Sequence, residues 1–201
     1  MTVSHMRVGG KVRAVAAATG TEHTRLVIVR GNSGAGKTSV ALAVRSHLGR
    51  TCALVQQDVI RRTILMERDV PDGANIGLMS LVARYALDQG YHVLIEGILR
   101  AEHYSPMLTE LARNHRGTTT FYYLDVTYPE SVRRHATRPQ SAEFGAEHMA
   151  AWYRHRDVLG VLRERVVPQS STLEQTTARI LDEAFGRNLP TPAHRSALDS
   201  T

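Results

Sequence analysis

The chain of 201 residues has little of what typically stabilises secreted proteins or anchors membrane proteins. Cys52 is its single cysteine, so no disulfide can form within one chain, which fits a reducing compartment. No apolar run approaches the roughly 20 residues that a membrane span needs, and residues 1–20 lack the apolar segment of a signal peptide. No His/Cys cluster has the spacing of a zinc site. We therefore expect a cytoplasmic protein without disulfides, structural zinc or a membrane anchor.

Lysine is also scarce. Only two of the 25 Lys and Arg residues are lysine, Lys11 and Lys37, and the net charge is +6. Arginine suits bidentate binding of phosphate groups. The positive charge forms no long block, as a nucleic-acid-binding tail would. The charge therefore favours a phosphorylated small molecule over nucleic acid as the partner, and nucleic acid is not excluded.

Short β-branched runs alternate with segments of helical periodicity along the chain. This alternation predicts an α/β domain with a five-stranded parallel sheet. The predicted strands cover residues 25–29, 52–56, 91–97, 118–126 and 165–169. The predicted helices cover residues 38–49, 58–69, 76–90, 101–117, 129–138, 147–159 and 171–186.

The same pattern divides the chain into one folded domain with loose ends. Residues 1–22 are expected to form a flexible leader, and residues 187–201, rich in Pro, Ser, Ala and Thr, a disordered tail. The domain between them, residues 23–186, is expected to carry a mobile lid at about 137–150.

The stretch "GNSGAGKT" matches G-x-x-x-x-G-K-[ST] and lies between a predicted strand and a predicted helix. Its glycines allow a tight turn that points backbone N–H groups at phosphate oxygens, and the helix N-terminus adds partial positive charge. Lys37 is expected to reach the β and γ phosphates and the Thr38 hydroxyl to bind Mg²⁺. The sequence thus predicts a site for ATP or GTP with Mg²⁺. The residues expected to bind the nucleotide are Gly31, Asn32, Ser33, Gly34, Ala35, Gly36, Lys37, Thr38 and Ser39.

Two acids stand at the ends of predicted strands, Asp58 after the second strand and Glu96 in the third. Ligands of open α/β sheets bind beside the carboxyl ends of strands. Glu96 is expected to hold Mg²⁺ or contact the acceptor; alternatively it pairs at the surface with Arg100, which is itself assigned to the substrate. Asp58 is expected to take the proton of an acceptor hydroxyl, and it would also suit a helix N-cap.

Arginines in two segments are candidates for binding negative charge. Arg134 and Arg138 share one helix face at the predicted lid, and such arginines can contribute about 10³–10⁵-fold to the rate of phosphoryl transfer. The alternative for this segment is a solvated basic face. Arg61 and Arg62 follow Asp58 and either bind an anionic part of the acceptor, the role assigned to Arg62, or pair with nearby acids.

The segment "LDQGYHVLIEGILR" (residues 87–100) resembles the zeta-toxin kinases, whose matching segment reads as a helix end, Gly-Tyr, a strand and Ile-Glu-Gly-x-Leu-Arg. Chloramphenicol phosphotransferase-like enzymes are a related group, and the resemblance spans about residues 25–140. It implies a three-layer P-loop kinase fold with an arginine-bearing lid. Zeta toxins phosphorylate a UDP-amino sugar; their acceptor base falls on Asp58, and their substrate-contacting glutamate falls on Glu96. Their usual acid-x-acid motif is Gln56-Gln57-Asp58 here.

The sequence therefore predicts a phosphotransferase that moves the γ phosphate of ATP to a hydroxyl of a small-molecule acceptor, a sugar nucleotide or an antibiotic. A toxin-like role would imply an antitoxin partner. Two alternatives stay open. One is a nucleoside, nucleotide or polynucleotide-end kinase, and the other is a non-catalytic nucleotide-binding module.

Overall fold

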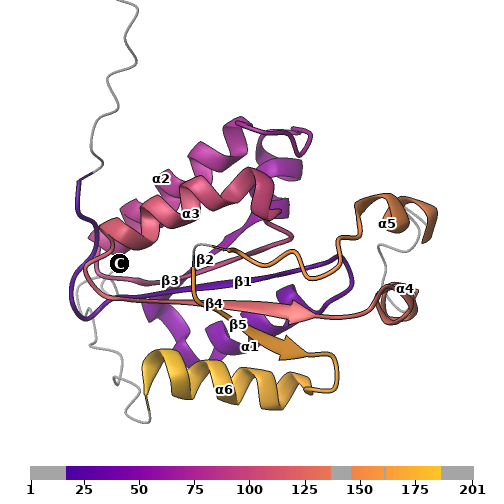
Figure 1. Cartoon of the computed structure of the whole chain (residues 1–201). Coiled ribbons are helices and arrows are strands. Elements are labelled where there is room, and N and C mark those ends of the chain that lie inside the picture. The colour runs from indigo at the N-terminus through magenta and orange to yellow at the C-terminus, as the bar shows by residue number, and fades with distance from the viewer. Residues whose placement is uncertain (1–16, 137–145, 161, 187–201) are drawn as a thin grey trace, which may run out of the picture.

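The computed structural model describes residues 17–136, 146–160 and 162–186. Its centre is a five-stranded, all-parallel sheet with the strand order β2-β3-β1-β4-β5 (Figure 1). The strands are β1 (Arg25–Gly31), β2 (Cys52–Gln56), β3 (His92–Gly97), β4 (Thr118–Asp125) and β5 (Glu164–Pro168). The prediction of a five-stranded parallel sheet is therefore confirmed.

Helices cover both faces of the sheet in three layers. Helices α2 and α3 lie on one face and α1 and α6 on the other (Figure 1). The described helices are α1 (Lys37–Leu48), α2 (Ala74–Asp88), α3 (Ala101–Asn114), α4 (Tyr128–His135), α5 (Ala146–Trp152) and α6 (Leu173–Phe185), with a 3₁₀ turn at Gly49–Thr51 and a π-helix, η2, at Val59–Ile64. Because the chain alternates strand and helix, the carboxyl ends of the parallel strands share one edge.

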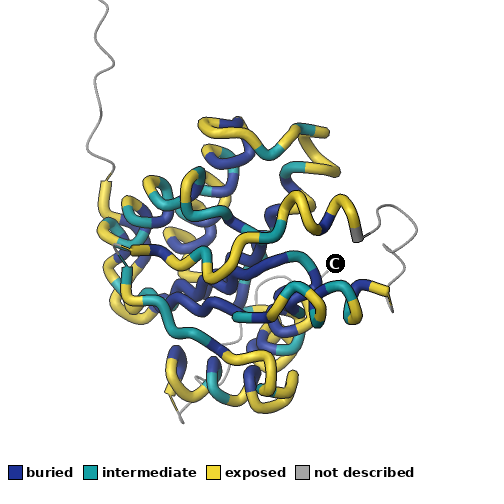
Figure 2. Tube along the Cα trace, turned by 45° about the vertical axis from the view of Figure 1, so that its right-hand side comes forward, coloured by how far each residue is buried: buried dark blue, intermediate teal, exposed yellow. Residues whose placement is uncertain are grey.

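The core forms on both faces because successive strand residues point to opposite sides. In β1, Leu26 and Ile28 pack with α2 and α3, whereas Val27 and Val29 pack with α1 and α6. Both sets are fully buried. Figure 2 shows this as a dark-blue sheet between helices whose outer sides are yellow. The apolar run at residues 26–29 of β1 therefore fits a strand covered on both faces.

Two predicted helices are much shorter in the structure, at about half of their expected length. The helix expected at residues 58–69 is the π-helix η2, in which Leu65 N bonds the Ile60 carbonyl five residues back. It ends at Ile64, and Met66 has a φ of 50°, outside the helical region. The helix expected at 147–159 ends at Trp152, and Arg156 has a φ of 46°.

Part of the segment expected to be a leader packs against the domain. Thr19 is buried, and its Oγ1 donates to Asp88 Oδ1 at 2.8 Å. Thr19 also forms a bridge with His115. The rest of the leader (1–16), most of the predicted lid (137–145) and the predicted tail (187–201) lie outside the described residues. Within the described part of the chain, no helix is long and apolar enough to cross a membrane.

Candidate functional site

The loop between β1 and α1 carries the sequence motif at residues 31–38. Gly34 and Gly36 have φ values of 80° and 96°, which favour glycine, and Gly36 precedes the first turn of α1. Lys37 is buried, and its Nζ donates to the Asn32 carbonyl at 2.9 Å, so the lysine folds back over the loop. This is the shape expected of a phosphate-binding loop, hereafter the phosphate loop.

Helix α4 closes over this loop at Gly34. A Cβ on Gly34 would lie 2.5 Å from the backbone oxygen of Ser131, closer than real Cβ atoms approach. Two features therefore favour glycine at this position, the positive φ and the close approach of the α4 backbone. This close approach places the middle of α4, at Ser131, beside the loop.

Glu96, at the end of β3, lies beside the phosphate loop rather than at the surface. It is 4% exposed, and its Oε1 accepts hydrogen bonds from Thr38 Oγ1 and Gln56 Nε2, both at 3.0 Å. The alternative of a surface ion pair with Arg100 is therefore wrong. Three elements, α1, β2 and β3, meet at this one carboxylate.

Asp58 follows β2 and lines the same space as the phosphate loop. It occupies the N-cap position of η2, but its side chain makes no capping hydrogen bond. Instead, Asp58 Oδ1 pairs with Arg61 at 3.1 Å, and the side chain is 65% exposed. The helix-cap role is therefore not realised, whereas the carboxylate is open to a ligand.

A cleft of about 640 Å³ brings most of the predicted residues together. The charged and polar side chains in its wall come from the phosphate loop, β3, the segment after β2 and α4. The lining residues are Ser33, Gly34, Lys37, Thr38, Ser39, Asp58, Val59, Arg62, Thr63, Glu96, Gly97, Ile98 and His135. Arg62, as predicted, is among them.

A second, smaller pocket of about 210 Å³ lies on the other side of the phosphate loop. Arg134 lines it: its Nη2 donates to the Gln169 carbonyl at 3.0 Å, and its Nη1 reaches the Ala35 carbonyl at 3.4 Å. Arg133 and Arg134 both bond Glu130 and lower the pKa of its carboxyl to about 2. The rest of the wall is mostly apolar and includes Val126, Val167, Pro168 and Leu173.

Comparison with known proteins shows the family and the fold. Residues 26–159 match a family model described as an AAA domain, which is more than half of the chain. The chain belongs to this AAA domain family. No curated protein sequence matches it.

Solved structures similar to this AAA-domain chain include three kinases. The first is the Mycobacterium tuberculosis APS kinase CysC in complex with AMPPNP and APS, with 20% identity, a TM-score of 0.59, and 82% of this chain and 97% of that chain covered. The second is a sugar kinase from Janibacter (21%, TM-score 0.56, 79% and 92%). The third is a gluconokinase from Sinorhizobium meliloti (18%, TM-score 0.53, 83% and 91%). At these identities the likeness shows the fold, which is that of the P-loop kinases.

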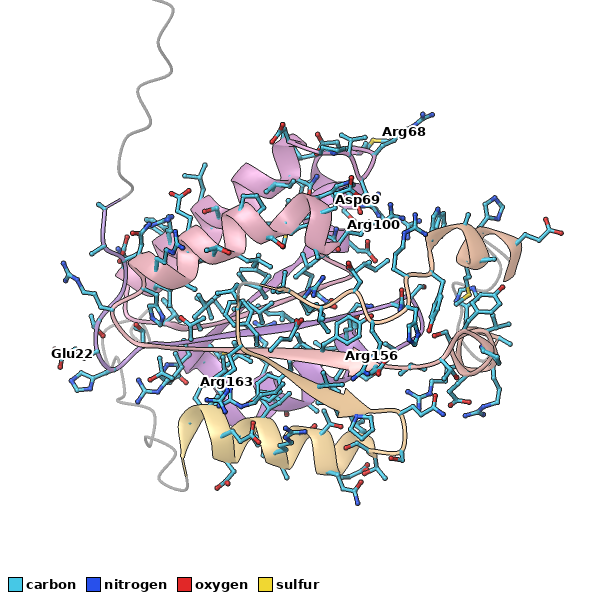
Figure 3. All side chains as sticks on the ribbon, viewed as in Figure 1. Glu22, Arg68, Asp69, Arg100, Arg156 and Arg163 are labelled. Atoms are coloured by element: carbon cyan, nitrogen blue, oxygen red, sulfur yellow. The ribbon has the colours of Figure 1, made fainter. Side chains whose placement is uncertain are left out.

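Some predicted site residues in the described part of this AAA-domain chain do not line the cleft. Ala35 and Gly36 line the smaller pocket, and Gly31 and Asn32 line neither. Arg100, labelled in Figure 3, occupies the N-cap position of α3 and is not in the cleft wall. Arg138 lies outside the described residues. Arg134 lines the smaller pocket instead of the cleft, because α4 directs it towards the β5–α6 loop.

Sequence reasoning missed three residues of the AAA domain that shape the site, His135, Gln56 and Arg30. For Asn32, which was expected to bind the nucleotide, it did not foresee the contacts with Arg154. His135 lines the cleft, and Gln56 bonds Glu96. Asn32 bonds both backbone groups of Arg154, at 2.7 and 3.0 Å. Arg30 is buried in β1. Gln56 could have been suspected, since it stands at a strand end, but the partners of Arg30 and Asn32 are more than 60 residues away in sequence.

Proposed function

We propose that the protein is a kinase that transfers the γ phosphate of ATP or GTP to a hydroxyl group of a small-molecule acceptor. One observation carries this proposal. Lys37 and Thr38 of the phosphate loop and Asp58, which follows β2, line one cleft. A cleft that holds a triphosphate at one end therefore has room for an acceptor at the other.

The nucleotide side rests on the phosphate loop and the smaller pocket. The backbone N–H groups before α1 and the Lys37 ammonium suit the phosphates. The pocket beside Arg134 combines apolar residues with polar backbone groups, which suits a purine base. The two spaces share Ser39, in the first turn of α1, so a bound nucleotide would bend around the phosphate loop.

Thr38 and Glu96 fit a magnesium ion. Hydroxyl and carboxylate oxygens are its preferred ligands, and Thr38 Oγ1 and Glu96 Oε1 lie 3.0 Å apart. No group of three or more His, Cys, Asp or Glu residues in the described part of the chain is placed to hold a metal. Mg²⁺ suits such a sparse site, because it keeps waters and shares its ligands with substrate phosphates. Once bound, it would neutralise charge on the β and γ phosphates.

On the acceptor side, the Asp58 carboxylate accepts the proton of the acceptor hydroxyl. The hydroxyl oxygen bonds the γ phosphorus while the bond to the bridging oxygen breaks, and the nucleoside diphosphate leaves. Lys37 binds the phosphates throughout and keeps them in position. Positioning and charge neutralisation of this kind supply most of the catalysis in phosphoryl transfer.

A screen of hydroxyl acceptors with γ-labelled ATP tests the proposal. It should include uridine sugars and antibiotics, as the zeta-toxin resemblance suggests, together with gluconate, APS and nucleosides. Product from one class identifies the acceptor. Asp58→Asn should then bind ATP normally and lose about 10²–10⁴-fold in kcat, while Asp72→Asn, at an exposed position outside the cleft, should keep full activity. Full transfer activity in Asp58→Asn, or no product from any class, would contradict the proposal.

A further inference from the structure

Arg30 lies in β1, directly before the phosphate loop, and its side chain is fully buried. A charge at the centre of a parallel sheet is costly to desolvate unless it is paired and hydrogen-bonded. Here the guanidinium is saturated. Its Nε and Nη2 donate to the Leu99 carbonyl at 3.1 and 2.7 Å, and its Nη1 and Nη2 donate to the carbonyl and the carboxylate of Asp157 at 2.6 and 3.0 Å. Glu164 completes the pairing at 3.1 Å.

The first partner, Leu99, belongs to the turn between β3 and α3. Gly97 and Ile98, which precede it, line the cleft on the acceptor side. The φ of Leu99 is 44°, a region that leucine rarely adopts. Gln57 Oε1 accepts from Leu99 N at 3.1 Å, and Arg30 binds the carbonyl, so contacts on both sides of the peptide hold this turn in place.

The second partner, Asp157, belongs to the stretch that follows α5, residues 153–159, hereafter the return segment. Asp157 Oδ2 also accepts from the backbone N–H of Ala101, the first residue of α3, at 2.9 Å. At the other end of the return segment, the Asn32 side chain bonds the N–H and C=O of Arg154. The return segment is therefore attached both to the phosphate loop and to the start of α3.

These contacts form one connected path. Lys37 Nζ donates a hydrogen bond to the Asn32 carbonyl, so a bound phosphate that attracts Lys37 changes this contact with Asn32. The Asn32 side chain hydrogen-bonds the return segment, and Asp157 of the return segment forms an ion pair with Arg30. Arg30 then holds the Leu99 carbonyl. Buried hydrogen-bond networks of this kind can carry coupling between two sites.

We propose that Arg30 is a positioning residue that couples nucleotide binding at the phosphate loop to the Gly97–Leu99 turn on the acceptor side of the cleft. The coupling rests on the proposed function, because it matters only where a nucleotide and an acceptor occupy the two sides together. Its consequence is that nucleotide binding stiffens the acceptor side before the acceptor arrives. A lysine cannot replace Arg30 here, since one ammonium lacks the planar fork that reaches three partners.

Hydrogen exchange of the full chain, with and without AMPPNP and Mg²⁺, tests the coupling without any acceptor. In the unmodified protein, nucleotide should slow exchange in the phosphate loop and also, by about 10-fold, in peptides covering 97–104 and 153–159. In Arg30→Lys, nucleotide should still slow exchange in the phosphate loop but should no longer slow it in peptide 97–104. Asp157→Ala, at a side chain that is 23% exposed, provides a second variant with less risk to folding and should behave alike. Arg163→Lys, at an exposed arginine labelled in Figure 3, is the matched control and should behave like the unmodified protein.

An unchanged response of peptide 97–104 in both variants would overturn the proposal. So would a loss of protection spread evenly over the whole sheet in both variants, because this would mean that Arg30 only stabilises the fold. If AMPPNP protects the phosphate loop of the unmodified protein but not peptide 97–104, the coupling is wrong while nucleotide binding stands. If AMPPNP does not bind at all, the proposed function itself fails.

Discussion

Replacing Gly34 by alanine should destabilise the protein more than the same change at Gly36, although both glycines lie in the phosphate loop at positive φ. Alanine in that backbone region costs about 1–2 kcal/mol at either position. The two sites differ in their surroundings. A Cβ at Gly34 would lie 2.5 Å from the Ser131 backbone oxygen, whereas a Cβ at Gly36 has no atom within 4 Å.

The size of the difference follows from this distance. Ordinary contact begins at 3.4 Å, so α4 or the phosphate loop must move by about 0.9 Å (3.4 − 2.5) to admit the Gly34→Ala methyl group. Overpacking of this kind costs about 1–3 kcal/mol. Gly34→Ala should therefore lose about 2–5 kcal/mol of unfolding free energy, and Gly36→Ala about 1–2 kcal/mol.

Urea unfolding of the two variants without nucleotide measures this difference directly, because bound phosphate would otherwise add its own stabilisation. The unmodified chain is the reference for both variants. Equal losses for the two variants, within about 0.5 kcal/mol, would refute the reasoning that α4 lies against the loop at Gly34. A larger loss for Gly36→Ala would refute it more strongly.

Two further predictions concern buried polar groups. Tyr104→Phe removes a hydroxyl that accepts from Gln57 Nε2 at 2.6 Å and lies 2.7 Å from Asn75 Oδ1. Urea unfolding should therefore show a loss of about 1–3 kcal/mol in unfolding free energy. The control Tyr85→Phe, at an exposed position, should show no measurable loss, and equal losses for the two variants would contradict the network. Burial, with a smaller effect of Arg25, lowers the pKa of His115 from 6.5 to about 4. Below pH 6.5 the unfolded chain therefore binds a proton that the folded chain refuses, and stability should fall by up to about 3 kcal/mol as the pH drops from about 6.5 to about 4. His115→Asn should remove this part of the pH dependence, and an unchanged pH profile would contradict it.

Much of the sheet could be predicted because its signals are local. A strand buried on both faces reads as an apolar run, as residues 26–29 do, and glycine ends α1 at Gly49. Helix α6 begins with a capping box of Thr172 and Gln175, which is also a local signal. The segment after β2 was mispredicted, because a π-helix and a left-handed Met66 depend on the contacts around them and not on periodicity.

The sequence by itself determined the order of strands and helices along the chain. It also determined the phosphate loop, because glycine, lysine and threonine at fixed spacing between a strand and a helix are typical of that loop. It also indicated Asp58 and Glu96 as site residues, since both stand at the ends of predicted strands. Only the tertiary structure decided their surroundings: Gln56 and Thr38 meet at Glu96, and Arg134 turns to the smaller pocket. These contacts join residues from separate elements, and their distances depend on how the elements pack, which no local pattern encodes.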